Sequence, residues 1–133
     1  MDKFRFLEHT ADLKFEAFGN TLEELFENAA RAMFSATTKA TPNPDNQIEM
    51  EIGAGSREEL LHDWLQGLLY KFITEDFLPS EYELSIEDNK LKAKVGGITF
   101  SGDVDTEVKA VTYHDLKVEK EDDGWHCVVV CDT

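Results

Sequence analysis

Residues 56–73 read SREELLHDWLQGLLYKFI, and this stretch does most to decide the fold. Ser56 and Glu59 form a capping box, the side-chain pairing that opens a helix. Behind it, large apolar side chains recur at helical spacing and form one stripe: Leu60, Leu61, Trp64, Leu65, Leu68, Leu69, Phe72 and Ile73. Pro79 follows and is expected to help stop the helix. A helix with such distinct faces is predicted to pack one of them on a sheet.

A second helix and several strands surround this stretch. Residues 21–34 open with the capping box Thr21–Glu24 and continue as an apolar stripe. Residues 47–52 alternate polar and apolar side chains, as a half-buried strand does, and residues 4–17 supply two more strand-like runs. Two hairpins are expected, one at residues 82–95, broken by Gly96-Gly97, and one at residues 108–130. This order predicts one α+β domain over residues 1–133, a two-layer sandwich with both helices on one face of a largely antiparallel sheet.

The composition is strongly acidic. The 133 residues include 28 Asp and Glu against 13 Lys and Arg, which gives a formal charge of −15. Strong direct binding of nucleic acid or of an anionic membrane is not expected, because clusters of Lys and Arg do that work. No signal peptide and no membrane span of about 20 apolar residues is expected. The acid excess suits solubility, a cation site or a basic protein partner.

Two cysteines, Cys127 and Cys131, lie in an apolar run typical of a buried strand. Four residues of strand separate them by about 13 Å. A disulfide requires Cα atoms within about 7 Å, so the two are expected to be free thiols that fill the core. This usage of cysteine favours a reducing compartment, the cytoplasm.

Polar residues beside apolar strands are the candidates for a functional site. No phosphate-binding glycine loop, zinc-protease motif or nucleophile elbow is found in the sequence, and no catalytic residue is assigned. Asp12 is a hard oxygen ligand, and His9 is a proton carrier or a ligand. The alternative is a tight connection in which Asp12 and Thr10 hydrogen-bond the local backbone. Asp132 and the carboxylate of Thr133 would repel one another unless a cation neutralises them, so the C-terminus is a plausible cation site.

Three further segments can be interpreted as structural or as functional. Lys109 is either a surface ion-pair partner or a contact to another molecule. His114 reads more readily as a residue at a strand end than as a ligand. A solvated face is expected for His62-Asp63, and His126 is given no functional role.

Two segments resemble the signatures of the archease family. The run from Phe6 to Asp12, FLEHTAD, continues through residues 19–30, GNTLEELFENAA, and resembles the N-terminal signature. Residues 107–114, EVKAVTYH, with Asp132 near the end, resemble the C-terminal one. The resemblance covers essentially the whole chain. One departure is the last residue, Thr133, where family chains commonly carry an aliphatic residue after the Asp.

The resemblance implies a non-catalytic partner of the GTP-dependent RNA ligase that splices tRNA halves. Such a partner promotes guanylylation and multiple turnover of the ligase and broadens its nucleotide choice. Asp12, Asp132 and Thr133 would then be ligands of a divalent cation, typically calcium. Lys109, His9 and His114 are the residues that could contact the ligase.

Two alternatives remain open at the level of sequence. One is a small metal-dependent hydrolase that uses Asp12, His9, His114 and Asp132, which requires a deep pocket holding all four. The other is a chaperone-like interaction module, which requires a large exposed apolar patch.

Overall fold

The computed structural model describes residues 3–8 and 12–133, and both capping boxes open helices in it. The hydroxyl oxygens of Thr21 and Ser56 accept the backbone N–H of Glu24 and Glu59, each at 3.1 Å. The elements run in the order β1 (Phe4–Leu7), β2 (Leu13–Gly19), α1 (Leu22–Thr37), β3 (Asn46–Gly53), α2 (Arg57–Glu75), β4 (Phe77–Glu87), β5 (Lys90–Thr99), β6 (Ala110–Val111), β7 (Lys117–Glu121) and β8 (Gly124–Asp132).

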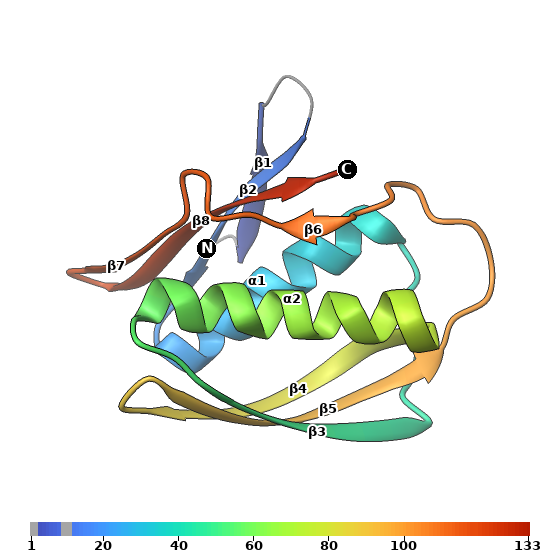
Figure 1. Ribbon diagram of the computed structural model, residues 1–133. Coiled ribbons are helices and arrows are strands. Elements are labelled where there is room, and N and C mark those ends of the chain that lie inside the picture. Colours follow the sequence, from blue (N-terminus) through green and yellow to red (C-terminus); the bar gives the residue numbers. More distant parts are fainter. Residues whose placement is uncertain (1–2, 9–11) are drawn as a thin grey trace.

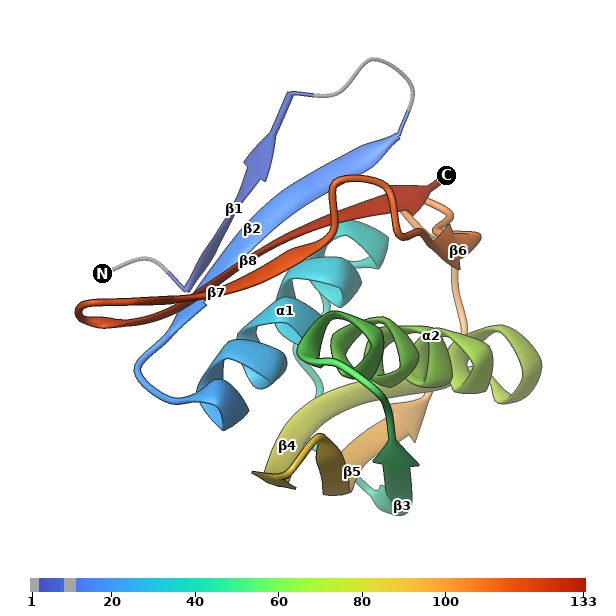
Figure 2. The same cartoon turned by 60° about the vertical axis from the view of Figure 1, so that its left-hand side comes forward.

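The strands form two antiparallel sheets with the helices between them (Figures 1 and 2). The larger sheet has the order β1-β2-β8-β6, and β7 also pairs with β8. The smaller one has the order β3-β5-β4. Helix α1 contacts β2 and β8 of the larger sheet and β4 of the smaller, and α2 likewise contacts strands of both. The predicted α+β class, the two helices and the antiparallel pairing are confirmed, but the strands divide into two sheets and make three layers.

The second face of α2 explains this third layer. Gly67 lies on the face opposite the apolar stripe, and a Cβ placed there would be 2.8 Å from the Met50 side chain of β3. Gln66, the preceding residue, accepts the backbone N–H of Val111 in β6 of the larger sheet at 2.8 Å. This face therefore packs on strands, and a sequence pattern that marks it as polar cannot distinguish such packing from contact with water.

Three local expectations differ from the structure. Helix α2 ends at Glu75 because Asp76 takes the left-handed conformation, and Pro79 lies inside β4. Strand β5 continues through Gly96-Gly97, opposite a β-bulge in β4 between Pro79 and Glu81. The predicted strand at residues 108–118 is interrupted after Val111, and Asp115 has a φ of 54° that no strand accommodates.

The buried core draws on both helices and both sheets. Trp64 is fully buried and its indole N–H donates to the Phe26 carbonyl at 3.0 Å, which ties α2 to α1. Cys127, Val129 and Cys131 of β8 point into this core. The intervening residues of β8 face the outside of the larger sheet, and the candidate site is at the end of that outer face.

Candidate functional site

Strand pairing brings Asp12 close to Asp132. The β2–β8 register pairs Leu13 with Cys131, so one further step places Asp12 across from Asp132. Successive residues of a strand point to opposite faces, and Cys131 points into the core, so both aspartates belong to the outer face of the larger sheet. Two carboxylates 120 residues apart in sequence thus meet at one end of adjacent strands.

Lys109 and Thr133 border the same position. The Lys109 N–H donates to the Asp132 carbonyl at 2.8 Å, and Ala110 of β6 pairs with Asp132. The end of β8 therefore lies between β2 and β6, and the C-terminus lies at this end of the sheet (Figures 1 and 2). Thr133 follows Asp132 directly, so its main-chain oxygens belong to the same end of the sheet.

Both carboxylates affect the pKa of the Cys131 thiol. Burial raises the pKa of Cys131 to about 12, and the negative charges of Asp132 and Asp12 add to the rise. A negative charge at either position therefore disfavours the thiolate form of the same buried sulfur atom. A cation between them would lower this negative potential.

Contacts through Asp115 and Lys14 link His114 to the segment that follows Asp12. Its Nε2 atom lies 3.4 Å from Oδ2 of Asp115, and the same oxygen lies 3.6 Å from Nζ of Lys14, two residues after Asp12. His114 is 68% exposed in its side chain, so it remains accessible to a partner. Asp115 and Lys14 were not singled out in the sequence, since only the folded loop at residues 112–116 brings them together.

His62 is not on a solvated face, contrary to expectation. Its side chain is only 16% exposed, and its Nε2 lies 3.0 Å from the Val111 carbonyl oxygen while its Nδ1 lies 2.9 Å from Asp63 Oδ1. The ring also stacks on Tyr113, with the centroids 4.0 Å apart. His62 thereby fixes residues 111–113, which precede His114, against α2.

The structure therefore gathers Asp12, Asp132, Thr133 and Lys109 at one end of the sheet and links His114 to them. His9 lies outside the described residues. Two carboxylates and a main-chain oxygen are the hard donors that Ca²⁺ prefers, so the chemistry of this set fits the expected ion. Within residues 3–8 and 12–133, the one group of three side-chain donors close enough to share an ion is a different one: Glu119, Glu121 and His126.

Glu16 and His126 form a buried pair that the sequence did not reveal. Glu16 is 7% exposed. Its carboxylate forms an ion pair with Arg5 and lies 2.8 Å from Nε2 of His126. Residue 126 is 110 positions from residue 16, and only the β2–β8 register brings them together. The sequence offered one signal for this region: in the segment Glu119-Lys120-Glu121 the two glutamates fall on one face of a strand.

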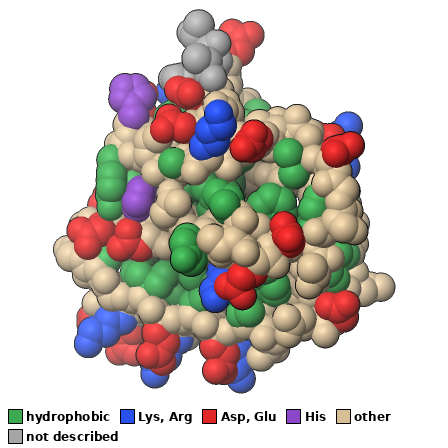
Figure 3. Space-filling view, turned by 45° about the vertical axis from the view of Figure 1, so that its right-hand side comes forward, with side chains coloured by type: hydrophobic (Ala, Val, Ile, Leu, Met, Phe, Trp, Pro, Cys, Tyr) green, Lys and Arg blue, Asp and Glu red, His purple; other side chains and the backbone are tan. Residues whose placement is uncertain are grey.

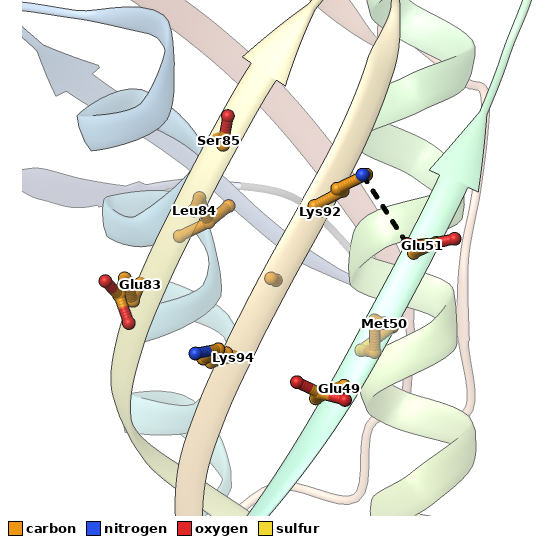
Figure 4. Close-up of a pocket in the computed structure, with 9 residues that line it drawn as sticks. Glu49, Met50, Glu51, Glu83, Leu84, Ser85, Lys92 and Lys94 are labelled. Carbon is orange, nitrogen blue, oxygen red and sulfur yellow. Dashed lines mark ion pairs between the residues drawn. The ribbon is translucent and has the colours of Figure 1, made fainter.

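A broad depression on the smaller sheet differs from these clusters in the character of its side chains (Figure 4). Its side chains alternate in sign, with Glu49 and Glu51 of β3 and Glu83 of β4 flanking two lysines of β5. Lys92 Nζ lies 3.9 Å from Glu51 Oε1, and both side chains are about three-quarters exposed (77% and 75%). Such exposed pairs contribute little to stability, so we interpret this surface as a solvated face.

Known proteins match this chain along nearly its full length. Residues 4–133 match the model of the Archease protein family (MTH1598/TM1083). This chain belongs to the archease family. It is 42% identical to the protein archease of Methanosarcina acetivorans, covering 98% of this chain and 95% of that relative, and 39% identical to that of Archaeoglobus fulgidus, covering 98% of each.

Solved archease-family folds agree with the architecture. The solution structure of Methanobacterium thermoautotrophicum protein 1598 superposes over 100% of both chains with a TM-score of 0.86 at 36% identity. A Thermotoga maritima archease, described as a possible chaperone, gives a TM-score of 0.71 at 30% identity over 96% of this chain and 94% of its own. The predicted archease resemblance is confirmed. Neither helix of the described chain is long and apolar enough to cross a membrane.

Proposed function

We propose that this archease activates a GTP-dependent, tRNA-splicing RNA ligase and has no catalytic activity of its own. The chain would promote guanylylation of the ligase, sustain its multiple turnover and widen the nucleotides it accepts. The proposal rests on family membership over residues 4–133 together with the meeting of Asp12 and Asp132 at one end of the larger sheet. Its buried free thiols suit a reducing compartment, and we place the protein in the cytoplasm.

The site would hold a divalent cation, calcium in our proposal. Asp12 and Asp132 would supply carboxylate oxygens, and Thr133 a main-chain oxygen. A bound ion would neutralise the two carboxylates and offer coordination positions to phosphate oxygens. Lys109 beside Asp132, and His114 through Asp115, would contact the ligase around this ion. The acidic surface would speed the encounter with a basic ligase.

Reconstitution with the cognate ligase tests the proposal. Ligase, GTP and limiting divalent metal are mixed with wild type, with Asp12→Asn, with Asp132→Asn, or with Asp45→Asn as the matched control. Asp45 is exposed, lies next to β3 on the other sheet, and loses the same charge. We expect wild type and the control to support repeated guanylylation, and the two site variants to lose at least about tenfold in rate.

Calcium titration of the isolated chain separates the site from the activity. Calorimetry should detect binding to wild type and to Asp45→Asn and weaker binding to Asp12→Ala. Unchanged calcium affinity in Asp12→Ala contradicts the site. A ligase that turns over equally fast without the chain contradicts the activator role.

A chaperone-like role is the second candidate. The Thermotoga maritima relative is described as a possible chaperone, and here Tyr70 and Ile73 of α2 are exposed apolar side chains, at 61% and 55%. Such a role would reduce aggregation of the ligase while leaving the guanylylation rate per soluble ligase unchanged. The same reconstitution distinguishes the two roles when soluble ligase is quantified.

A further inference from the structure

A second cluster lies on the outer face of the larger sheet, at the opposite end from Asp132. His126 lies six positions before Asp132 on β8, a distance of about 20 Å along the strand. Across β7, Glu119 pairs with His126, and Glu121 lies two residues further along on the same face. The Glu119 and Glu121 carboxylates and one His126 ring nitrogen bring ligand atoms within 4.8 Å of one another.

The His126 ring is held in a defined orientation. Its Nε2 lies 2.8 Å from the buried Glu16 carboxylate, which can only accept a hydrogen bond when ionised, so this nitrogen carries a proton. The ring also stacks on Phe18, with the centroids 5.2 Å apart. Arg5 pairs with the other oxygen of Glu16 and balances its charge. A neutral ring in this arrangement directs the Nδ1 lone pair toward Glu119 and Glu121.

Nδ1 is the atom that points to a ligand. It is buried and makes no hydrogen bond to any residue that the structure describes. The nearest carboxylate oxygen, Oε1 of Glu121, is 3.5 Å away, which is longer than a hydrogen bond to a ring nitrogen. Buried nitrogen atoms are nearly always satisfied by a partner, so an unpaired one beside two carboxylates requires an explanation.

We propose that Glu119, Glu121 and Nδ1 of His126 bind a first-row divalent transition metal ion such as Zn²⁺. Metal-bound histidines commonly donate their second ring N–H to a carboxylate, which is the position of Glu16. One imidazole and two carboxylates suit zinc, whereas calcium takes oxygen donors only. Three protein ligands leave a coordination position open to water or a partner's side chain. The proposal is independent of the calcium site and of ligase activation.

The local charges favour a cation here. Glu119 and Glu121 are more than half exposed, at 53% and 57%, so a metal ion can reach them without local unfolding. Lys117 Nζ lies 3.6 Å from Oε1 of Glu119 and partly balances its charge. Lys117 lies two residues before Glu119 on β7 and would turn outward as the ion binds.

Zinc titration with calcium present in excess tests the proposal. Wild type is compared with Glu119→Gln, Glu121→Gln and the matched control Glu83→Gln, an exposed glutamate on the smaller sheet. We expect wild type and the control to bind one Zn²⁺, and each of the other two variants to bind at least about tenfold more weakly. Cobalt should give the visible absorption of a low-coordinate site in wild type and in the control, and not in Glu119→Gln or Glu121→Gln.

Nitrogen-15 spectra of the histidine rings supply a readout at the atom itself. In the metal-free chain we expect His126 to be protonated on Nε2 only, and Zn²⁺ to shift its Nδ1 resonance. His114→Gln should leave that shift unchanged, since His114 lies at the other end of the sheet. Equal zinc affinity in all variants overturns the proposal. So does a His126 ring that carries protons on both nitrogens and does not respond to zinc, because the ring would then be an ion-pair partner of Glu16 and Glu121.

Discussion

At the scale of single residues, the two cysteines show how burial sets chemistry. Cys127 and Cys131 point from β8 into the core, and both are free. Burial raises the pKa of each thiol to about 12, from an ordinary value of 9.0, because a thiolate loses its hydration there. A hydrogen bond from the Ala17 backbone offsets only part of this rise at Cys127. Both thiols therefore stay protonated and unreactive in the folded protein at neutral pH.

This burial predicts a loss of stability at alkaline pH. Between pH 9 and 12 the unfolded chain releases thiol protons that the folded chain retains, so the free energy of unfolding falls as pH rises. The loss should be on the order of 1 kcal/mol per thiol near pH 10. Urea unfolding at several pH values measures it. The Cys127→Ala/Cys131→Ala double variant should show a flatter pH dependence, and parallel curves for the two proteins would contradict the assignment.

Whether a residue's contacts could be predicted depended on how many residues separate the two partners in the sequence. The separation of the two cysteines follows from the repeat of a strand, and the sequence sufficed to predict it. The solvated face expected for His62 was wrong because its partner, Val111, is 49 residues away. The contact of His126 with Glu16 spans 110 residues, so the sequence alone did not indicate it. Asp12 and Asp132 were selected by family resemblance and by their place beside apolar strands, and only the register shows that they meet.

At the scale of elements, helices were predicted better than sheets. A capping box and an apolar stripe are local signals, and both helices begin at the expected caps. Sheet membership is set by pairing between distant segments, so alternation identified strands without showing that they divide into two sheets. Gly96-Gly97 reads locally as a break, whereas in the fold it permits close approach of β4 to β5.

Gly97 provides an element-scale prediction. A Cβ at this position would lie 2.3 Å from the Leu78 carbonyl oxygen, a backbone atom of β4 next to the bulge. Gly97→Ala must therefore displace one strand and weaken the β4–β5 pairing. We expect a loss of about 2 kcal/mol or more in the free energy of unfolding, measured by urea denaturation.

Gly53→Ala is the matched control on the same sheet. A Cβ there meets no atom within 4 Å, so the free energy of unfolding should change by no more than about 0.5 kcal/mol. Equal losses for the two substitutions would show that backbone freedom, and not close approach, governs both positions. A stable Gly97→Ala variant would contradict the observed bulge geometry.

At the scale of the whole molecule, the position of the charges matters as well as their sum, which is −15. Acidic side chains are scattered across the face in Figure 3, with few basic ones between them. The outer face of the smaller sheet interleaves glutamates with lysines, while the end of the larger sheet holds Asp12, Asp115 and Asp132 around one proposed site. Total charge governs solubility, but attraction at short range depends on the charges nearest the partner.

This distribution predicts which face a basic ligase approaches. The triple variant Asp12→Asn/Asp115→Asn/Asp132→Asn and the triple variant Glu49→Gln/Glu51→Gln/Glu83→Gln each remove three negative charges, from the larger and the smaller sheet respectively. Stopped-flow association of the metal-free chain with the ligase, across a range of salt concentrations, should show a fast, salt-sensitive rate for wild type. The larger-sheet variant should associate several-fold more slowly at low salt and depend less on salt, whereas the smaller-sheet variant should resemble wild type. Charges more than a Debye length of about 10 Å from the partner are largely screened, so the two faces should affect its association very differently. Equal slowing by both variants would contradict this expectation and would mean that net charge alone steers the encounter.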